Sequence, residues 1–274
     1  MNPDGVTEEK LLLLKNFGVN RISLGIQSFS DNILTFLGRP HNAKEALKSI
    51  DTVSKHFTNF SIDIIGGIPH VERDWKIDYG FIKMILPPHI SFYLLSIEEG
   101  TEFFNKVYID EELQASEYTN FSEFCKSLGY RHYEISNFCI NNNFARHNLI
   151  YWNRCEYMGF GPSAASFIKH SDSEMRIINK NNIETYLETP DAMEIEYLGE
   201  KEKLFEELFL PLRTDFGLKL TELAKKFPEL NSKLTTNIEK LIELKLLEKK
   251  GEAIVIPEKH FLITNEIILK IIPI

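Results

Sequence analysis

Residues Gly18 to His41 read GVNRISLGIQSFSDNILTFLGRPH, and the first half of this stretch decides the fold. In residues 22–27, ISLGIQ, apolar and polar side chains alternate with a period of two, which predicts a β-strand with one apolar and one polar face. Helical patterns on both sides favour a parallel β/α unit over a hairpin. Helices cover the apolar face of a strand in a barrel of such units, so the polar face looks inward. A row of Ser, Gly and Gln fills a core poorly and suits the lining of a lumen, so we expect a ligand site here.

Three such β/α units are predicted within residues 1–105. Thr7 is expected to cap a helix over residues 8–17, Ser30 a short helix ending at residue 38, and an Asn42–Glu45 capping box the next helix. A further helix is expected over residues 74–84. The strands are predicted over Arg21–Gln27, Ser61–Ile65 and Ile90–Ser96. Three units are too few to close a barrel, so the predicted fold class is α/β with an incomplete β/α barrel.

A second, mainly helical region follows. Helices are predicted over residues 111–128, 183–188, 201–210, 219–226, 231–247 and 261–272. A strand-like segment, YRHYEIS, precedes a loop-rich stretch over residues 137–166, and a short strand is expected over residues 253–256. Helices followed by a β-wing resemble a winged-helix fold. We therefore predict three parts, residues 1–105, 106–196 and 197–274.

Composition excludes some classes of function. The 274 residues carry a net charge of −9, which argues against a nucleic-acid-binding surface. The longest apolar run, Ile267–Ile274, is interrupted by Lys270 and is too short to span a bilayer, and the start, MNPDGVTEEK, lacks the pattern of a secretory signal. We expect a cytoplasmic protein with no integral membrane segment.

Several further motifs carry a family resemblance together with residues 18–41. They are SIDIIGGIP (61–69), HISFYLLSIEEGT (89–101), YRHYEISNF (130–138), ARHNLIYW (145–152) and GFGPSAAS (159–166). In this order they resemble the radical S-adenosylmethionine (SAM) proteins of the oxygen-independent coproporphyrinogen III oxidase group, and above all its HemW branch of heme chaperones. The resemblance implies part of a radical SAM barrel in residues 1–105, a region covering the barrel in 106–196, and the family's winged-helix-like tail in 197–274.

The resemblance implies a function in heme or porphyrin metabolism. A HemW-like protein would bind SAM and a [4Fe–4S] cluster and carry heme. The alternative within the group is a true oxidase, which removes hydrogen and CO2 from propionate side chains by a 5′-deoxyadenosyl radical; YEISNF and RHNLIYW favour the chaperone. An alternative of another class is a DNA-binding winged helix. Between residues 218 and 260, however, nine lysines and seven glutamates interleave, which is typical of a solvated surface.

Five residues are candidates for contact with SAM. Gln27 lies at the carboxyl end of its strand, where β/α barrels hold ligands. Asp63 shares the inward face and needs polar partners there, which ribose hydroxyls or an ammonium group would supply. Arg39 follows a short helix and could bind a carboxylate in bidentate fashion. Considered one at a time, Gln27 is as readily a solvated strand end, Asp63 a member of a structural ion pair and Arg39 a surface charge. By motif, the three match SAM-contacting positions of the family, and Ser96 and Ala165 match contacts near the adenine.

His147 is the candidate for contact with heme. It lies in the ARHNLIYW motif, which we expect to be a loop, and a histidine there can ligate heme iron or form a structural hydrogen bond. Two positions depart from the family pattern. Gly66 stands where an aromatic residue is usual, and Ala165 stands where a histidine is usual.

The cysteines predict that this chain cannot carry out radical chemistry alone. Cys125, Cys139 and Cys155 are 14 and 16 residues apart, unlike the CxxxCxxC loop that holds the family's cluster. Such a loop, with the GGGTP segment after it, would belong to a missing N-terminal half-barrel of roughly one hundred residues, in the same gene or on a separate chain. Without that partner, we expect the edge of strand Arg21–Gln27 to be bare and open to pairing.

Overall fold

The computed structural model describes residues 1–171, 173–189 and 191–272. The chain forms two compact units, Met1–Phe144 and Ala145–Ile274, and each is described here by itself. The sequence-based division at residues 105 and 196 stays a prediction.

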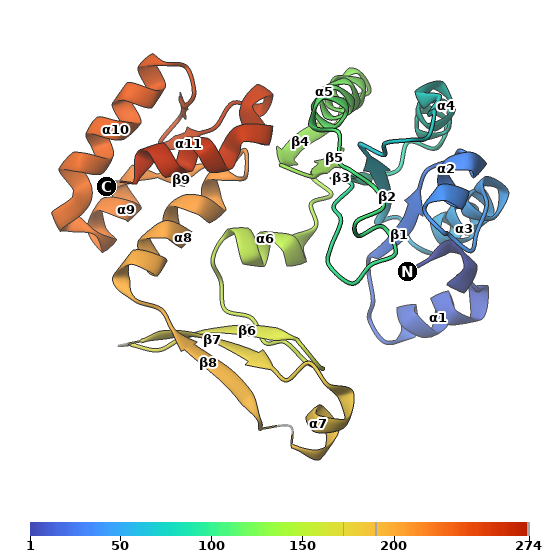
Figure 1. Ribbon diagram of the computed structural model, residues 1–274, viewed down its shortest axis with the longest axis horizontal. Helices are drawn as coiled ribbons and strands as arrows, with labels where there is room; N and C mark the ends of the chain where they lie inside the picture. Colours follow the sequence, from blue (N-terminus) through green and yellow to red (C-terminus); the bar gives the residue numbers. More distant parts are fainter. Residues whose placement is uncertain (172, 190, 273–274) are drawn as a thin grey trace. The chain divides into compact units, whose positions relative to one another are not determined.

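The first unit is built on a five-stranded sheet (Figure 1). Three parallel strands come first, β1 (Ile22–Gln27), β2 (Phe60–Gly66) and β3 (His89–Leu94), and an antiparallel pair extends the sheet, β4 (Arg131–Glu134) and β5 (Asn137–Cys139). The strand order is β1-β2-β3-β5-β4. The three predicted β/α units are confirmed. Strand β5 lies at the start of the stretch predicted to be loop-rich, and it pairs with both β3 and β4.

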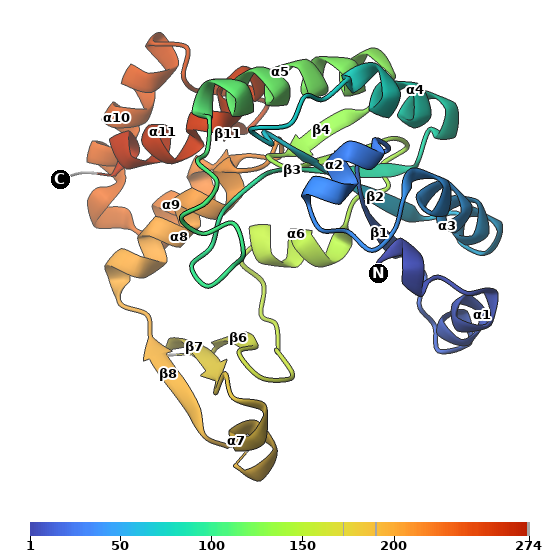
Figure 2. The ribbon, with the colours of Figure 1, turned by 45° about the vertical axis from the view of Figure 1, so that its right-hand side comes forward.

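Helices follow the strands along one side of this sheet (Figure 2). They are α1 (Glu8–Asn16), α2 (Asp31–Phe36), α3 (Ala43–His56), α4 (Trp75–Ile85) and α5 (Glu111–Ser127), with a 3-10 turn η1 (Pro3–Gly5) before them. The Asn42–Glu45 capping box is confirmed by both of its hydrogen bonds, of 2.9 and 3.0 Å. Thr7 Oγ1 caps α1 by accepting from Lys10 N. Ser30 precedes α2, but its hydroxyl is bound to Asn32 and does not cap the helix.

The alternating pattern of the strands places apolar side chains on one face of the sheet and polar side chains on the other. Leu24, Ile26, Ile62, Ile64, Ile90 and Phe92 are at most 1% exposed. An aromatic cluster from α4 and α5 packs on this face, with the Phe92 and Phe121 rings stacked at 4.1 Å between centroids. The opposite face carries Ser23, Ser61 and Asp63, and the pairing register places Ser23 beside Ser61. The predicted polar face therefore exists.

The packing around Gly66 explains why β2 has no aromatic residue at this position. A Cβ atom at Gly66 would lie 2.2 Å from Cζ of Phe92, whose ring is almost completely buried. Phe92 thus occupies the space that a side chain at position 66 would need, on the face of the sheet that α4 and α5 cover.

We expect Gly66→Ala to lower the free energy of unfolding by about 1–3 kcal/mol, because Phe92 must leave its stacked position to relieve the overlap. Gly80→Ala is the matched control, since Gly80 lies in α4 with no atom near its added Cβ, and alanine there should stabilise the helix by about 0.5–1 kcal/mol. Urea unfolding measures both variants. Equal effects of the two substitutions would contradict this account of Gly66.

The edge of β1 is partly covered, which corrects the expectation of a bare edge. The Met1 α-amino group donates to Ser23 O at 2.6 Å, and Gly25 N donates to Met1 O at 3.1 Å. These two bonds flank Leu24 in the manner of a parallel strand pair. Residue 1 therefore takes the place of a neighbouring strand over this short stretch of β1.

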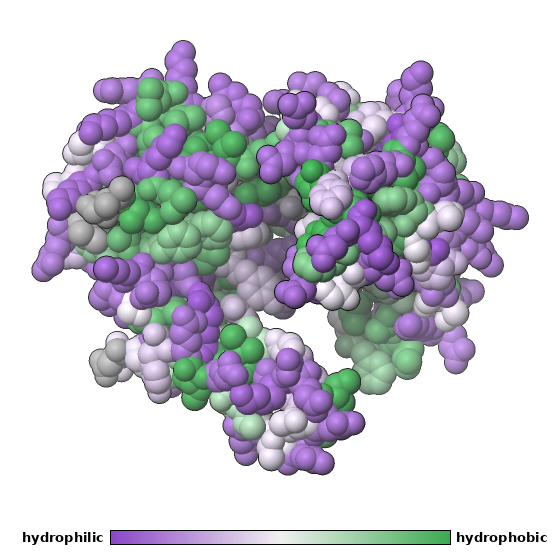
Figure 3. Space-filling model, viewed as in Figure 1, coloured by the Kyte–Doolittle hydropathy of each residue, from purple (hydrophilic) through white to green (hydrophobic). Residues whose placement is uncertain are grey.

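The second unit begins with α6 (Arg146–Trp152) and a three-stranded antiparallel sheet of β6 (Ala165–Lys169), β7 (Glu174–Asn179) and β8 (Met193–Tyr197). Helix α7 (Ile183–Glu188) connects β7 and β8. The stretch predicted to be loop-rich, residues 137–166, thus contains α6 as well as β5. Figure 3 shows apolar side chains at the surface of the β6–β8 region, where Ile195 is 49% exposed.

The rest of the second unit confirms the predicted helices with a β-wing. Its elements are α8 (Glu200–Leu212), β9 (Leu218–Lys219), α9 (Leu220–Lys226), η2 (Pro228–Leu230), α10 (Asn231–Glu243), β10 (Glu248–Lys250), β11 (Ala253–Val255), η3 (Glu258–Ile263) and α11 (Thr264–Ile271). Strands β10, β11 and β9 form the wing. The single helix predicted over residues 261–272 is divided into η3 and α11. Among the described residues, no helix has the length and apolar character to cross a membrane.

Candidate functional site

The carboxyl end of β1 holds Gln27 in an unusual backbone conformation. Its φ is +68°, in the left-handed region, and the β1–β2 pairing shifts register between Leu24 and Gln27. Such a conformation is strained for a residue other than glycine. The Gln27 side chain is buried, and its Oε1 has no hydrogen-bond partner among the described residues. A buried, unpaired acceptor at a strained strand end is typical of a ligand site.

Arg39 lies beside Gln27. A Cβ atom at Gly25 would lie 3.0 Å from Gln27 Nε2, 3.4 Å from Asn2 Oδ1 and 3.6 Å from an Arg39 Nη. The ends of three polar side chains thus converge over a glycine. Arg39 Nε is also buried and without a partner among the described residues. The unmet acceptor of Gln27 and the unmet donor of Arg39 fit a ligand end that carries both a donor and an acceptor, such as the ammonium and carboxylate groups of an amino acid.

Asp63 lies on the same polar face, on β2. Ser23 Oγ donates to its carboxylate at 2.8 Å, and Ser91 on β3 also forms a hydrogen bond with it. Burial raises the pKa of Asp63 above its ordinary value, although both hydrogen bonds and the positive charge of Arg21 act to lower it. The carboxylate is therefore costly in the absence of a further partner. Hydroxyl or ammonium groups of a ligand would supply one.

The other predicted contacts lie on other elements. Ser96 is exposed and lies two residues beyond the end of β3, since the strand predicted to reach Ser96 ends at Leu94. Ala165 begins β6 and belongs to the second unit. His147 also belongs to the second unit, and it lies in helix α6, which corrects its predicted place in a loop. Its Nε2 is 2.7 Å from the hydroxyl of Tyr151, one turn along the helix.

Sequence reasoning missed the residues that fix the loops of the site. Asp78 on α4 is completely buried and accepts from Ser28 Oγ at 2.9 Å and from Phe29 N at 2.7 Å. Arg73 Nε donates to the same carboxylate at 3.0 Å, and Arg73 also donates to Ile65 O near the end of β2. One ion pair thus joins the segment after Gln27 to the segment after Asp63. The sequence carries no local signal for it, because Asp78 is one charged residue in a helix.

A buried chain of hydrogen bonds connects side chains of the polar face. Ser61 Oγ lies 2.7 Å from His89 Nδ1, and His89 Nε2 lies 2.8 Å from the Tyr133 hydroxyl. Burial, together with the charge of Arg21, lowers the pKa of His89 well below its ordinary value. His89 is therefore neutral at physiological pH, and it links β2, β3 and β4 as a structural residue.

The cysteines do not form a cluster site. Cys125 and Cys139 are buried in the first unit, whereas Cys155 is exposed in the second. Over the described part of the chain, no group of three His, Cys, Asp or Glu residues is placed to hold a metal ion. The residues present do not fit a [4Fe–4S] cluster.

Comparison with known proteins identifies the class. Residues 1–81, which contain Gln27, Arg39 and Asp63, match the radical SAM superfamily, and residues 198–262 match the HemN C-terminal domain. A solved structure of coproporphyrinogen III oxidase (HemN) from Escherichia coli covers 99% of this chain, which spans 68% of that one, with a TM-score of 0.80 and 15% identity. The chain is thus a radical SAM protein in fold.

Its relatives define the family within that class. The heme chaperone HemW of Lactococcus lactis is 30% identical over 98% of this chain and 73% of its own length. HemW of Bacillus subtilis is 29% identical over 97% of this chain and 73% of its own length, and HemW of Synechocystis is 30% identical over 92% and 64%. The chain belongs to the HemW family.

Proposed function

We propose that this chain acts as a heme chaperone in the cytoplasm, binding SAM in its first unit and carrying heme. The observation that supports the SAM site is the pair of unmet polar atoms, Gln27 Oε1 and Arg39 Nε, on two side chains whose ends converge over Gly25. Arg39 would hold the carboxylate of the amino-acid part of SAM, and Gln27 would bind the other polar groups of that part. The family supports heme as the cargo, since its members are named for that role.

Asp63 would bind the ribose hydroxyls or the ammonium group of SAM. Its carboxylate already accepts from two serines, and a further donor would compensate for its burial. Ser96 would contact the adenine end after β3, and the motif assigns Ala165 to the same end of SAM. SAM supplies the 5′-deoxyadenosyl group in radical SAM chemistry. The residues of this chain bind and orient it.

The iron–sulfur cluster would come from outside the residues described here. Since Cys125, Cys139 and Cys155 do not converge, we propose that a segment or partner chain with the CxxxCxxC loop adds to the first unit beyond Met1, at the β1 side of the sheet. The oxidase alternative shares the fold through HemN, but the sequence relatives favour the chaperone.

Titration of the chain with SAM by calorimetry, and with ferric heme by absorbance, tests the proposed function under anaerobic conditions. We expect one molecule of each to bind. A chain that binds neither, even after addition of the cluster-bearing segment, would contradict the proposal.

His147→Ala is expected to weaken binding of ferric heme about tenfold and to leave binding of metal-free protoporphyrin unchanged, because an imidazole contributes mainly through the iron. The side chain is exposed, so the free energy of unfolding should change by less than about 0.5 kcal/mol. His170→Ala is the control, as it removes another exposed histidine of the same unit. Equal heme affinity in both variants would remove His147 from the site.

A further inference from the structure

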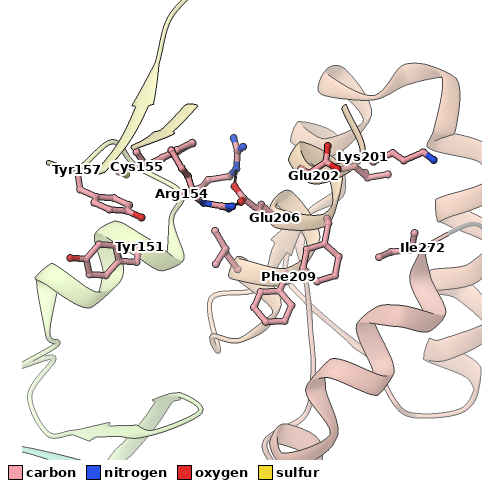
Figure 4. Close-up of a pocket in the computed structure, with 14 residues that line it drawn as sticks. Tyr151, Arg154, Cys155, Tyr157, Lys201, Glu202, Glu206, Phe209 and Ile272 are labelled. Carbon is pink, nitrogen blue, oxygen red and sulfur yellow. Dashed lines mark hydrogen bonds and ion pairs between the residues drawn. The ribbon is translucent and has the colours of Figure 1, made fainter. Parts of the chain in front are cut away.

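The second unit contains a large cavity between α8 on one side and α6 with the β6–β7 sheet on the other (Figure 4). Its volume is about 950 Å³, at the upper end of the range for small-molecule sites. The cavity lies near the carboxyl end of α6, where Tyr151 lines it. His147, one helical turn earlier, is hydrogen-bonded to the hydroxyl of that tyrosine.

Aromatic rings form two walls of this cavity. On one side, the ring centroids of Tyr151 and Tyr157 are 4.7 Å apart in an edge-to-face pair, and Phe167 lies beyond them. On the other, Phe205 and Phe209 of α8 stack at 5.1 Å. Figure 4 shows Tyr151 and Tyr157 facing the cavity from the side opposite Phe209. Tyr151 and Phe205 are 37% and 38% exposed, so a ligand would bury apolar area that water now contacts.

The charged residues of the cavity divide into a fixed group and an open one. Arg154 is 5% exposed at its side chain and is paired with Glu174 at 2.5 Å and Glu206 at 2.8 Å. Its charge is therefore already compensated, and it stiffens the wall. Lys201 and its neighbour Glu202, in contrast, are exposed, and neither has an ion-pair partner among the described residues. A carboxylate on a bound ligand would meet this lysine.

We infer that this cavity holds the tetrapyrrole, with the flat macrocycle between the two aromatic walls and a carboxylate side chain directed to Lys201. The inference rests on the proposed function and adds where in the second unit the tetrapyrrole binds. Aromatic faces on both sides suit a planar aromatic ligand, whereas a flexible acyl chain gains nothing specific from them. The volume and the unpaired cation fit a large dicarboxylate better than a neutral metabolite.

Cys155 provides a direct test, because it lines the cavity and is exposed, while Cys125 and Cys139 are buried. The full chain is labelled with a thiol-reactive fluorophore in the presence and absence of metal-free protoporphyrin IX and of ferric heme. We expect each ligand to slow labelling of Cys155 at least tenfold. Binding seen by absorbance without protection of Cys155 would overturn the inference and leave the proposed function intact. Absence of any tetrapyrrole binding would overturn both.

A second variant tests the aromatic wall. Phe205→Ala should weaken protoporphyrin binding about tenfold, because it removes one stacked ring from the wall. Phe216→Ala is the control, since Phe216 is 40% exposed in the same unit but does not line the cavity. Both side chains are partly exposed, so both variants should fold, which circular dichroism checks. Equal affinities of the two variants would contradict a site between these walls.

Discussion

Asp78→Ala is expected to lower the free energy of unfolding of the first unit by about 3–5 kcal/mol. The substitution leaves the Arg73 guanidinium, whose side chain is 3% exposed, as an uncompensated buried charge. It also removes the acceptor of Ser28 Oγ and Phe29 N, which lie in the protein interior. Urea unfolding followed by the fluorescence of Trp75, in a Trp152→Phe background, reports on this unit alone.

Two comparisons make this result specific. Asp51 forms an ion pair with Lys55, but both side chains are about two-thirds exposed, so Asp51→Ala should cost less than about 1 kcal/mol. Replacing both members of the buried pair, by Arg73→Met with Asp78→Leu, should cost less than Asp78→Ala alone, because no unpaired charge remains. A loss in Asp78→Ala no larger than in Asp51→Ala would refute the role of this pair.

The same pair connects stability to the ligand site. Ser28 and Phe29 directly follow Gln27, whose left-handed backbone has to be held by its surroundings. Asp78 is thus a positioning residue for Gln27. In the milder variant Asp78→Asn, which keeps the shape of the side chain, we expect weaker SAM binding in protein that is still folded.

The sequence could predict the strands of the first unit because their pattern is local. Alternation in residues 22–27 and the inward parity of Asp63 follow from the period of a strand, and both are present in the structure. The grouping of Gln27 and Arg39 in one site was predicted from the order of the family motifs. The contact of Asp78 with Ser28 and Phe29 could not be predicted, because two segments about fifty residues apart leave no periodic trace of their pairing.

The second unit was harder to predict for a different reason. Helix α6 has only seven residues, too few to show helical periodicity, and two of them are aromatic. Strand β7 reads EMRIIN, in which the two adjacent isoleucines break the alternation. Side chains on both faces of β7 and β8 are exposed or partly exposed, so no clean apolar face marks these two strands.

Asp63→Asn is expected to have opposite effects on stability and on ligand binding. Burial raises the pKa of Asp63 in the folded state above its unfolded value. The stabilising contribution of this group is therefore fully present below the unfolded pKa and is lost as the pH rises through the folded pKa. At pH 8 the wild type carries the cost of a buried charge, which asparagine removes. We expect the variant to be more resistant to urea than the wild type at pH 8. Between pH 4 and pH 8, its stability should fall less than that of the wild type.

SAM binding should respond in the other direction. If the carboxylate accepts from ribose hydroxyls or an ammonium group, its replacement by a neutral amide should weaken SAM binding about thirtyfold, as expected for a hydrogen bond to a charged group. Calorimetry at pH 8 measures this, with Asp51→Asn as a control that should change neither property. A variant that is less stable at pH 8 and binds SAM as tightly as the wild type would show that Asp63 is a structural residue. The opposite pair of results would mean that the fold tolerates a costly buried carboxylate because its ligand needs it.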